Sequence, residues 1–293
     1  MIVILGPTAS GKTNLAVKIA SKYQGEIISA DSRQVYRGLN IGTEKITEKE
    51  MDGVPHYLID IVEPTEVFTV EQFKVMAERC IDDITLRNRL PMIVGGTGFY
   101  IDSIVKNLAI PKVPPNDELR EKLNKKSAEE LYEELKEKDE ERAELIDEHN
   151  KRRLIRALEI IEAIGKVPKL NNSSEKYNVL SIGIQTDNSI LKEKISSRLN
   201  DSLIEGLVEE VKSLLESGIG KEQMNEFGLE YKIASQFIHS EITKNEMIEK
   251  MKTELWQYAK RQRTWFKRDK NIKWFSLEER DEIEEEVSKF LED

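Results

Sequence analysis

A phosphate-binding loop near the start of the chain constrains the fold more than any other feature of the sequence. It follows the apolar run 1–5 and matches the pattern G-x-x-x-x-G-K-[ST] at every position. Its residues are Gly6, Pro7, Thr8, Ala9, Ser10, Gly11, Lys12 and Thr13. The pattern works where a buried strand passes through the loop into a helix, because the loop N–H groups and the positive end of the helix then face one anion. The sequence therefore predicts a strand–loop–helix unit that binds a di- or triphosphate.

Two side chains of the loop have separate tasks in this prediction. Lys12 supplies a mobile cation, and Thr13 offers a hydroxyl ligand to Mg²⁺. A glycine-rich turn with a chance lysine is the alternative interpretation, and the strand and helix expected on either side of the loop disfavour it.

Composition limits the class of protein. The chain has 293 residues, one Cys and three His, so it is long enough for a large hydrophobic core. A single Cys excludes an internal disulfide, and these few ligands disfavour a structural zinc site. No apolar stretch approaches the roughly 20 residues that cross a bilayer. We therefore expect a cytoplasmic protein with no membrane partner, and we infer no obligate protein partner.

Short β-branched runs alternate with amphipathic stretches over the first hundred residues. The expected strands are 2–5, 26–29, 56–61 and 92–94. A helix is expected to begin at a capping box formed by Thr69 and Gln72. Such alternation predicts an α/β fold with a parallel sheet. Because ligands collect at the carboxyl ends of parallel strands, the glycine-rich turn 95–98 should lie close to the phosphate-binding loop.

The pattern changes at the proline-rich segment 111–115, where we place the start of an insertion. A Lys- and Glu-rich helical stretch follows to about residue 164, Gly165 is expected to end it, and 171–174 is expected to form a loop. We therefore divide the chain into a discontinuous core, residues 1–113 and 176–293, and a helical insertion, residues 114–175.

The second part of the core should begin with a strand over 179–185 and continue with helices around 190–217 and 244–267. The last helix has a predicted buried stripe at helical spacing, formed by Met247, Met251, Leu255 and Tyr258.

Two polar residues follow expected strands and should lie beside the loop. A carboxylate at Asp31 is a candidate base or magnesium ligand, and a helix N-cap or turn aspartate is the alternative. Thr97 would present its hydroxyl to the bound phosphate, although an ordinary tight turn also explains the glycines around it.

The net charge of −10 disfavours a nucleic-acid partner at first sight, but the local distribution of charge decides this question. Two short segments are basic. One contains Lys151, Arg152, Arg153 and Arg156, and the other, 260–268, interleaves cations with Trp265 and Phe266. Cations neutralise RNA phosphates and aromatic rings stack on bases. Solvated helix faces with core aromatics are the alternative interpretation.

Six segments of the chain together resemble the tRNA dimethylallyltransferase (isopentenyltransferase) family. They are residues 6–13, 31–36 (D-S-R-Q-V-Y), 41–45 (I-G-T-E-K), 56–61 (H-Y-L-I-D-I), 95–100 (G-G-T-G-F-Y) and 156–159 (R-A-L-E). The resemblance runs nearly end to end and extends to 259–266 (A-K-R-Q-R-T-W-F). It therefore covers far more than the widespread phosphate-binding loop.

The resemblance implies a P-loop NTPase-like core with a tRNA-binding helical insertion. It also implies transfer of a dimethylallyl group from dimethylallyl diphosphate to the exocyclic N6 amine of the adenosine 3′ to the anticodon, with Mg²⁺ as cofactor. The partners are then dimethylallyl diphosphate and the anticodon stem-loop of tRNA. Asp31 takes the position of the general base and Thr97 the position that contacts diphosphate and base, while Lys12 and the rest of the loop hold the diphosphate.

The expected tRNA contacts combine this resemblance with the basic segments. They are Asp31, Ser32, Arg33, Gln34, Thr97, Arg152, Arg153, Leu154, Ile155, Arg156, Lys260, Arg261 and Arg263. The segment 227–232 (F-G-L-E-Y-K) departs from the more frequent I-G-Y-[KR]-[EQ], and it leaves Lys232 as the candidate for a further cation at the diphosphate.

Two other classes of function share the loop. A P-loop kinase of small molecules or nucleosides would use Asp31 on a substrate hydroxyl and the arginines as a lid. A nucleotide switch that binds RNA should carry a guanine-recognising N-K-x-D motif, and the nearest match, residues 124–127, lacks the aspartate.

Overall fold

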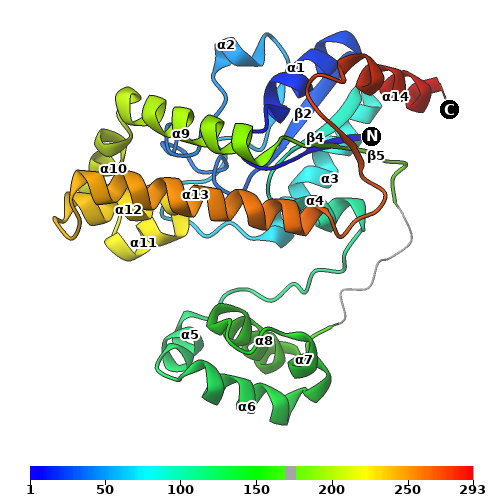
Figure 1. Cartoon of the computed structure of the whole chain (residues 1–293). Coiled ribbons are helices and arrows are strands. Elements are labelled where there is room, and N and C mark those ends of the chain that lie inside the picture. The colour runs from blue at the N-terminus through cyan, green and yellow to red at the C-terminus, as the bar shows by residue number, and fades with distance from the viewer. Residues whose placement is uncertain (169–175, 293) are drawn as a thin grey trace. The chain divides into compact units, whose positions relative to one another are not determined.

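The structure is a computed structural model that describes residues 1–168 and 176–292 (Figure 1). It divides into two compact units: Met1–Lys106 with Glu175–Asp293, which we call the core unit, and Asn107–Ser174, which we call the helical unit. The insertion is predicted to begin at residue 114, and the helical unit begins at Asn107. The loop predicted over 171–174 and the second predicted boundary, at 175, lie outside the described residues.

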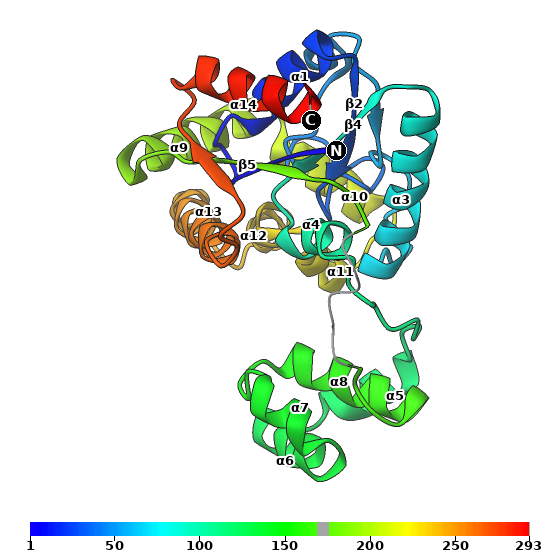
Figure 2. The same cartoon turned by 90° about the vertical axis from the view of Figure 1, so that its right-hand side faces the viewer.

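Six strands within the described ranges form one parallel sheet at the centre of the core unit (Figure 2). They are β1 (Ile2–Leu5), β2 (Gly25–Ala30), β3 (His56–Tyr57), β4 (Leu90–Gly95), β5 (Leu180–Ile184) and β6 (Lys273–Phe275). Their order across the sheet is β3-β2-β4-β1-β5-β6. β1 pairs with β4 and β5, and all four of its residues are buried. A strand of this kind needs helices on both faces of the sheet.

The register of the sheet brings the ends of three strands together. Leu5 pairs with Gly95, and Gly95 pairs with Ala30. Since these strands are parallel, the phosphate-binding loop, the segment that begins at Asp31 and the glycine-rich turn all leave the sheet at one edge. A Cβ atom placed on Gly96 would lie 3.5 Å from the backbone oxygen of Gly6. The predicted closeness of the turn to the loop is therefore confirmed.

The helices of the core unit follow the strands in the expected alternation. They are α1 (Lys12–Lys22), α2 (Glu48–Met51), α3 (Val70–Leu86), α4 (Gly98–Val105), α9 (Asn188–Glu205), α10 (Leu207–Glu216), α11 (Lys221–Phe227), α12 (Leu229–Ile238), α13 (Lys244–Phe266) and α14 (Arg280–Glu292). α3 begins at the predicted capping box of Thr69 and Gln72. No described helix combines the length and the apolar character that crossing a membrane requires.

Alternate residues of β1 face opposite layers of the core unit. Ile2 and Ile4 belong to a cluster that contains residues of α1 and α14, whereas Val3 and Leu5 pack with α3, α4 and the end of α13. In Figure 2, α1 and α14 lie on one side of the strands and α4 on the other. Helices α9 to α13 share a separate hydrophobic cluster. These five helices therefore have a core of their own beside the sheet.

Three sequence predictions for the core unit need correction. The strand predicted over 56–61 is limited to two residues, because Leu58 and Asp60 have φ values of 61° and 53° that a strand does not allow. The helix predicted around 190–217 is two helices, since Gly206 has a φ of 107° between α9 and α10. The buried stripe of α13 continues from Leu255 through Ala259, and Tyr258 is only half-buried.

The helical unit consists of α5 (Asp117–Asn124), α6 (Ala128–Lys138), α7 (Glu140–Leu145) and α8 (Lys151–Ile164) in its described part. These helices share a hydrophobic cluster that includes Leu131, Leu135 and Leu158. α8 ends at Gly165, whose φ of 86° gives the left-handed cap predicted from the sequence.

A buried carboxylate joins the segments of the helical unit. The side chain of Glu159, on α8, is 1% exposed and accepts hydrogen bonds from the backbone N–H of Asn116 (2.7 Å) and from Arg120 (2.8 and 3.1 Å). It also forms an ion pair with Arg156, which donates to the backbone oxygen of Val113 (2.7 Å). Burial opposes the charge of Glu159, but the hydrogen bonds from Asn116, Arg120 and Arg156 hold its pKa below the usual range.

We expect Glu159→Gln to lower the free energy of unfolding of the helical unit by about 2 kcal/mol. This is less than the roughly 3–5 kcal/mol of a broken buried ion pair because both guanidinium groups are about one-third exposed. The three Trp residues all lie in the core unit. The urea midpoint of unfolding followed by far-ultraviolet circular dichroism should therefore fall, whereas the midpoint followed by tryptophan fluorescence should not change. Glu162→Gln, at an exposed position of the same helix, is the control.

The same pair of probes tests the pH dependence. Because the folded pKa of Glu159 is depressed, its stabilisation is complete above the pKa of an unfolded glutamate and is lost as the pH falls through the lower folded value. Equal unfolding midpoints for Glu159→Gln and wild type by circular dichroism would contradict the role given to this carboxylate.

Candidate active site

The phosphate-binding loop leaves β1 and enters α1 at Lys12. Ala9 and Gly11 have φ values of 59° and 85°, and these left-handed residues curl the loop back on itself. Lys12 is half-buried and donates to the backbone oxygen of Pro7 (3.3 Å). The strand, the curled loop and the helix start are the geometry that an anion-binding loop requires.

A second cation lies beside Lys12. Burial lowers the pKa of Lys12. The negative charges of Asp31 and Glu44 raise this pKa, and the positive charge of Arg198 lowers it. Arg198 extends from α9 and forms an ion pair with Glu44, which also accepts a hydrogen bond from the Thr8 hydroxyl (3.3 Å). Two cations and two carboxylates are therefore within electrostatic reach of the loop.

Arg198 is a residue that the sequence analysis missed. It belongs to no recognisable motif, and only the need to neutralise a second phosphate could have drawn attention to it. Lys232, the cation predicted for this task, is exposed on α12. Arg198 is therefore a second candidate for this cation, and it is the one within electrostatic reach of Lys12.

Asp31 and Thr97 are held next to each other. Asp31 Oδ1 accepts from the backbone N–H of Arg33 (2.8 Å) and Gln34 (3.3 Å), so this residue does form the turn given as the alternative interpretation. Within the described residues both bonds use Oδ1, which fixes the carboxylate and leaves Oδ2 to accept a proton. Thr97 Oγ1 accepts from the backbone N–H of Ser32 (3.1 Å) and donates to the hydroxyl of Ser32 (3.4 Å).

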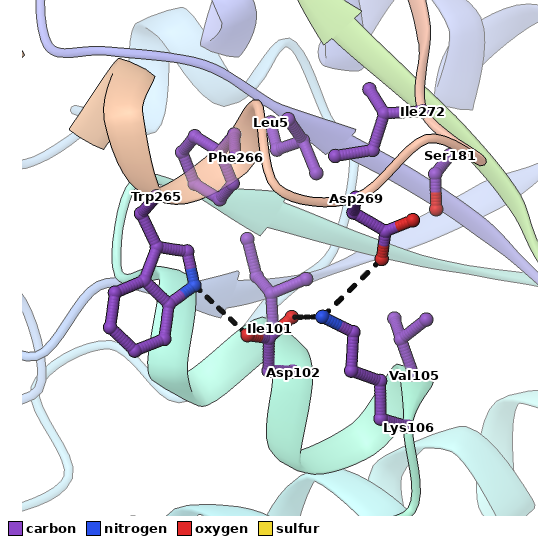
Figure 3. A pocket seen from close by; sticks show the side chains of 10 residues that line it. All are labelled: Leu5, Ile101, Asp102, Val105, Lys106, Ser181, Trp265, Phe266, Asp269 and Ile272. Carbon is purple, nitrogen blue, oxygen red and sulfur yellow. Dashed lines mark hydrogen bonds and ion pairs between the residues drawn. The ribbon is translucent and has the colours of Figure 1, made fainter. Parts of the chain in front are cut away.

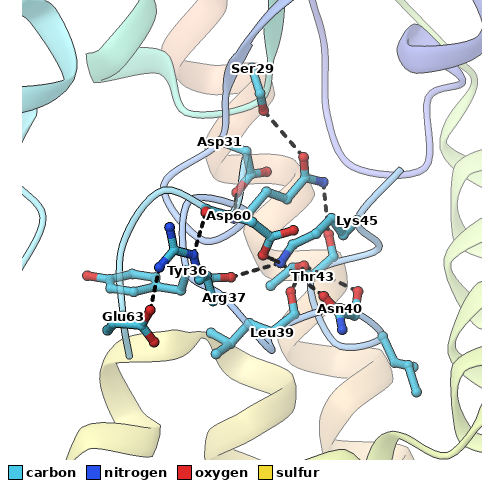
Figure 4. A network of polar contacts seen from close by, with 12 residues as sticks. Ser29, Asp31, Tyr36, Arg37, Leu39, Asn40, Thr43, Lys45, Asp60 and Glu63 are labelled. Carbon is cyan, nitrogen blue, oxygen red and sulfur yellow. Dashed lines mark hydrogen bonds and ion pairs between the residues drawn. The ribbon is translucent and has the colours of Figure 1, made fainter. Parts of the chain in front are cut away.

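A polar network orders the segment after Asp31 (Figure 4). Gln34 accepts from the Ser29 hydroxyl (3.3 Å) and donates to the backbone oxygens of Thr43 (3.1 Å) and Glu44 (3.2 Å). The side chain of Gln34, predicted to contact tRNA, is thus engaged in holding Glu44 near the loop. Lys45, whose side chain is 6% exposed, supports the same segment from its other side.

Lys45 and Glu210 complete the support of this segment. Lys45 donates to the backbone oxygen of Tyr36 (2.8 Å) and pairs with Asp60. The carboxylate of Glu210, on α10, accepts three consecutive backbone N–H groups, those of residues 40–42, at 2.9 to 3.1 Å. It also accepts from the hydroxyl of Tyr231 (2.6 Å), whose ring would clash with any Cβ on residue 42. No local sequence pattern indicates these long-range contacts.

Ionisable groups from α12 and α13 surround Asp31. Burial raises the pKa of Glu230 to about 7, and the charges of Glu44 and Asp31 add to the rise while Arg33 opposes it. Burial likewise raises the pKa of Tyr258, which interacts with Asp31 and Arg33. Near neutral pH one carboxyl of this cluster is therefore partly protonated.

The site fits a magnesium ion only together with phosphate. Thr13 is exposed at the start of α1. No group of three or more His, Cys, Asp or Glu side chains in the described ranges could hold a metal ion by itself. Mg²⁺ at Thr13 would therefore take most of its ligands from phosphate oxygens and water, which is its usual mode of binding to phosphate substrates.

The basic segment of α13 has an inner and an outer face. Phe266 is 3% exposed, and the indole N–H of Trp265 donates to Asp102 (2.9 Å), whose carboxylate also pairs with Lys106 (2.9 Å) in the small pocket of Figure 3. Phe266 therefore belongs to the core, as the alternative interpretation held, whereas Trp265 is half-buried and carries the guanidinium of Arg268 4.9 Å from its ring centre. Of the cations, Lys260 and Arg261 are exposed, and Arg263 donates to Asn188.

The basic segment of the helical unit also has buried and exposed residues. Leu154 and Ile155 are 0% and 7% exposed and pack in the core of the unit, whereas Arg156 is about one-third exposed and pairs with Glu159. Arg152 and Arg153 have exposed side chains in the first turn of α8, which contains no acidic residue. Cations at the positive end of a helix dipole are unfavourable unless an anion joins them.

Comparisons with known proteins agree with one another. A family model for IPP transferases matches residues 34–269. The tRNA dimethylallyltransferase of Anoxybacillus flavithermus is 41% identical over 99% of this chain and 94% of its own length, and that of Clostridioides difficile is 40% identical over 100% and 97%.

Solved structures show the same likeness. The full-length tRNA isopentenylpyrophosphate transferase of Bacillus halodurans is similar with a TM-score of 0.76 and 36% identity, over 99% of this chain and 96% of that one. A eukaryotic dimethylallyltransferase described as acting on tRNA is similar with a TM-score of 0.79 and 27% identity, over 94% of this chain and 73% of that one.

We expect Arg198→Ala to weaken binding of inorganic pyrophosphate about ten- to a hundredfold, because it removes a charge-assisted donor and leaves Glu44 unpaired beside the anion. Isothermal titration calorimetry in the presence of Mg²⁺ measures the change. Lys232→Ala, which removes the exposed cation of α12, should bind like wild type. A larger loss in the Lys232 variant would return the second cation to that residue.

Proposed function

Because this chain belongs to the IPP transferase family, we propose that its phosphate-binding loop holds the diphosphate of a prenyl donor, which is the leaving group of the reaction. The protein transfers a dimethylallyl group to tRNA. The proposal adds that dimethylallyl diphosphate is the donor and that the acceptor is the N6 amine of the adenosine 3′ to the anticodon.

One observation carries this proposal: Asp31 and Thr97 are joined through Ser32 at the sheet edge where Lys12 and Arg198 lie. The adenine amine is a poor nucleophile because its lone pair is delocalised into the ring, and it must lose a proton as it attacks. A carboxylate at the correct distance accelerates such a step by about 10²- to 10⁴-fold. Asp31 Oδ2 is the proposed proton acceptor, since the turn of Asp31 already uses Oδ1.

One bond breaks at the diphosphate and one bond forms at the adenine amine. The bond between the allylic carbon and the diphosphate oxygen breaks, and the electron pair leaves with the diphosphate. The N6–C bond forms, and the amine proton goes to Asp31. Lys12, Arg198 and the loop N–H groups stabilise the negative charge that develops on the leaving group. Mg²⁺ bound by Thr13 and phosphate oxygens would supply further charge to the same group.

Recognition of tRNA is proposed to use the exposed cations of both units. In the helical unit these are Arg152 and Arg153, and in the core unit Lys260 and Arg261. The adenosine must leave the anticodon loop to reach Asp31, which costs a few kcal/mol that phosphate contacts offset. We propose cytoplasmic location on the same ground, because the substrate is tRNA.

We expect Asp31→Asn to lower kcat for prenyl transfer about 10²- to 10⁴-fold while tRNA affinity stays within about threefold of wild type. The amide keeps an oxygen for the turn with Arg33 and Gln34 but cannot accept the proton. Purified protein is incubated with Mg²⁺, labelled dimethylallyl diphosphate and unmodified tRNA, without ATP. Asp52→Asn, at an exposed left-handed helix end that tolerates Asn, is the control.

Two outcomes of this assay would contradict the proposal. Unimpaired turnover of Asp31→Asn would remove the assignment of the base. Wild-type protein that transfers no label to tRNA but transfers phosphate from ATP to a hydroxyl acceptor in a parallel reaction would favour a kinase activity of the phosphate-binding loop.

We expect Arg153→Ala to weaken tRNA binding at every tRNA sequence tested and to reduce the slope of log K against log salt by about 1, because one phosphate contact is lost. Filter binding or fluorescence anisotropy over a range of salt concentrations measures both. Lys136→Ala removes an exposed cation from α6 of the same unit and should leave the slope unchanged. Equal slopes for Arg153→Ala and wild type would exclude Arg153 from the contact surface.

A further inference from the structure

A buried side-chain amide connects the phosphate-binding loop to the glycine-rich turn. Gln262 of α13 is 6% exposed, although its neighbours Arg261 and Lys260 face solvent. Its Oε1 accepts from the backbone N–H of Thr8 (2.9 Å), and its Nε2 donates to the backbone oxygen of Gly96 (3.0 Å). Both halves of the amide are therefore used, one on each loop.

The amide stands where the sheet cannot continue. β1 and β4 pair as far as Leu5 and Gly95, and beyond these residues the two backbones leave the ladder. A side-chain amide offers the same donor and acceptor as a peptide group, so Gln262 extends the hydrogen bonding between the two strands by one step into their loops. Fixing two irregular segments in this way is what a buried, fully satisfied polar group can achieve.

Close packing around the amide leaves little freedom. A Cβ atom on Gly96 would lie 2.3 Å from Gln262 Nε2, and one on Gly98 would lie 2.3 Å from the ring of Trp265. Gln262 and Trp265 are three residues apart and share one face of α13. The helix therefore contacts the turn on both sides of Thr97.

The two loops that Gln262 joins carry the two halves of the chemistry. Thr8 belongs to the diphosphate cradle and bonds to Glu44, the partner of Arg198. Gly96 precedes Thr97, which is bonded to the segment of Asp31 through Ser32. A shift of one loop against the other would change the distance between leaving group and nucleophile.

We propose that Gln262 is a positioning residue that fixes the phosphate-binding loop against the turn of Thr97 and so aligns the diphosphate with the attacking amine. Its side chain is 6% exposed and acts through the backbones of Thr8 and Gly96. The inference rests on the proposed function, because alignment matters only if both groups react. Misplacement of reacting groups by about 1 Å costs on the order of 10²-fold in rate.

Two variants test the proposal. Gln262→Met keeps the length of the side chain and removes both hydrogen bonds, and Gln262→Glu keeps an acceptor for Thr8 but loses the donor to Gly96. Gln257→Met makes the same change as the first variant at an exposed position of α13 and is the control. For each protein, kcat, the KM values for donor and tRNA, inhibition by inorganic pyrophosphate and the melting temperature are measured.

We expect kcat to fall about ten- to a hundredfold in both Gln262 variants, while KM and the pyrophosphate inhibition constant stay within about threefold of wild type. Gln257→Met should match wild type throughout. If Gln262→Met does not fold, Gln262→Glu decides the question with the same measurements.

Several results would overturn the proposal. A lower melting temperature with unchanged kcat would make Gln262 a structural residue. A loss of pyrophosphate affinity as large as the loss of kcat would assign it to the cradle instead. Wild-type protein that transfers no label would overturn the proposed function and this inference with it, whereas active wild type and active variants would overturn the inference alone.

Discussion

The parallel register of β1, β4 and β2 is the constraint on which the rest of the structure depends. Leu5, Gly95 and Ala30 stand side by side in the sheet, so three loops with unrelated sequences must leave it at one edge. Each loop contributes one component: the cradle with Lys12, the carboxylate of Asp31 and the hydroxyl of Thr97. The sheet thereby gathers groups that lie far apart in the sequence and requires no local motif to do so.

Charge balance around the cradle offsets the repulsion between two cations that lie beside one loop. Arg198 forms an ion pair with Glu44, and Lys12 interacts electrostatically with both Glu44 and Asp31. These carboxylates hold the cations in place before an anion arrives, which avoids the cost of ordering them on binding. Burial is the main cause of the raised pKa of Glu230, and the negative charges of Glu44 and Asp31 add to the rise.

Local signals in the sequence predicted the elements of the site, and long-range contacts were beyond their reach. The loop, the strand of residues 179–185 and the caps at Thr69 and Gly165 depend on neighbouring residues, and each is confirmed. Arg198, Glu210 and Gln262 act across more than thirty residues of sequence, and no local pattern encodes their partners. The shortening of β3 has a local cause, the left-handed backbone of Leu58 and Asp60. The sequence does not predict that conformation for these residue types.

The segment 259–266 shows why composition alone misleads about the use of a helix. Cations and aromatics lie close together along the chain there, which suits RNA, yet a helix turns by 100° per residue and separates them in space. Gln262 and Phe266 continue the buried stripe of Met247, Met251 and Leu255, so they face the protein, while Lys260 and Arg261 face solvent. The same eight residues can therefore present charge to a nucleic acid and hold two loops of the site together. A motif of this kind constrains both faces, because a change on the inner face would alter the geometry of the reaction without touching any charge on the outer one.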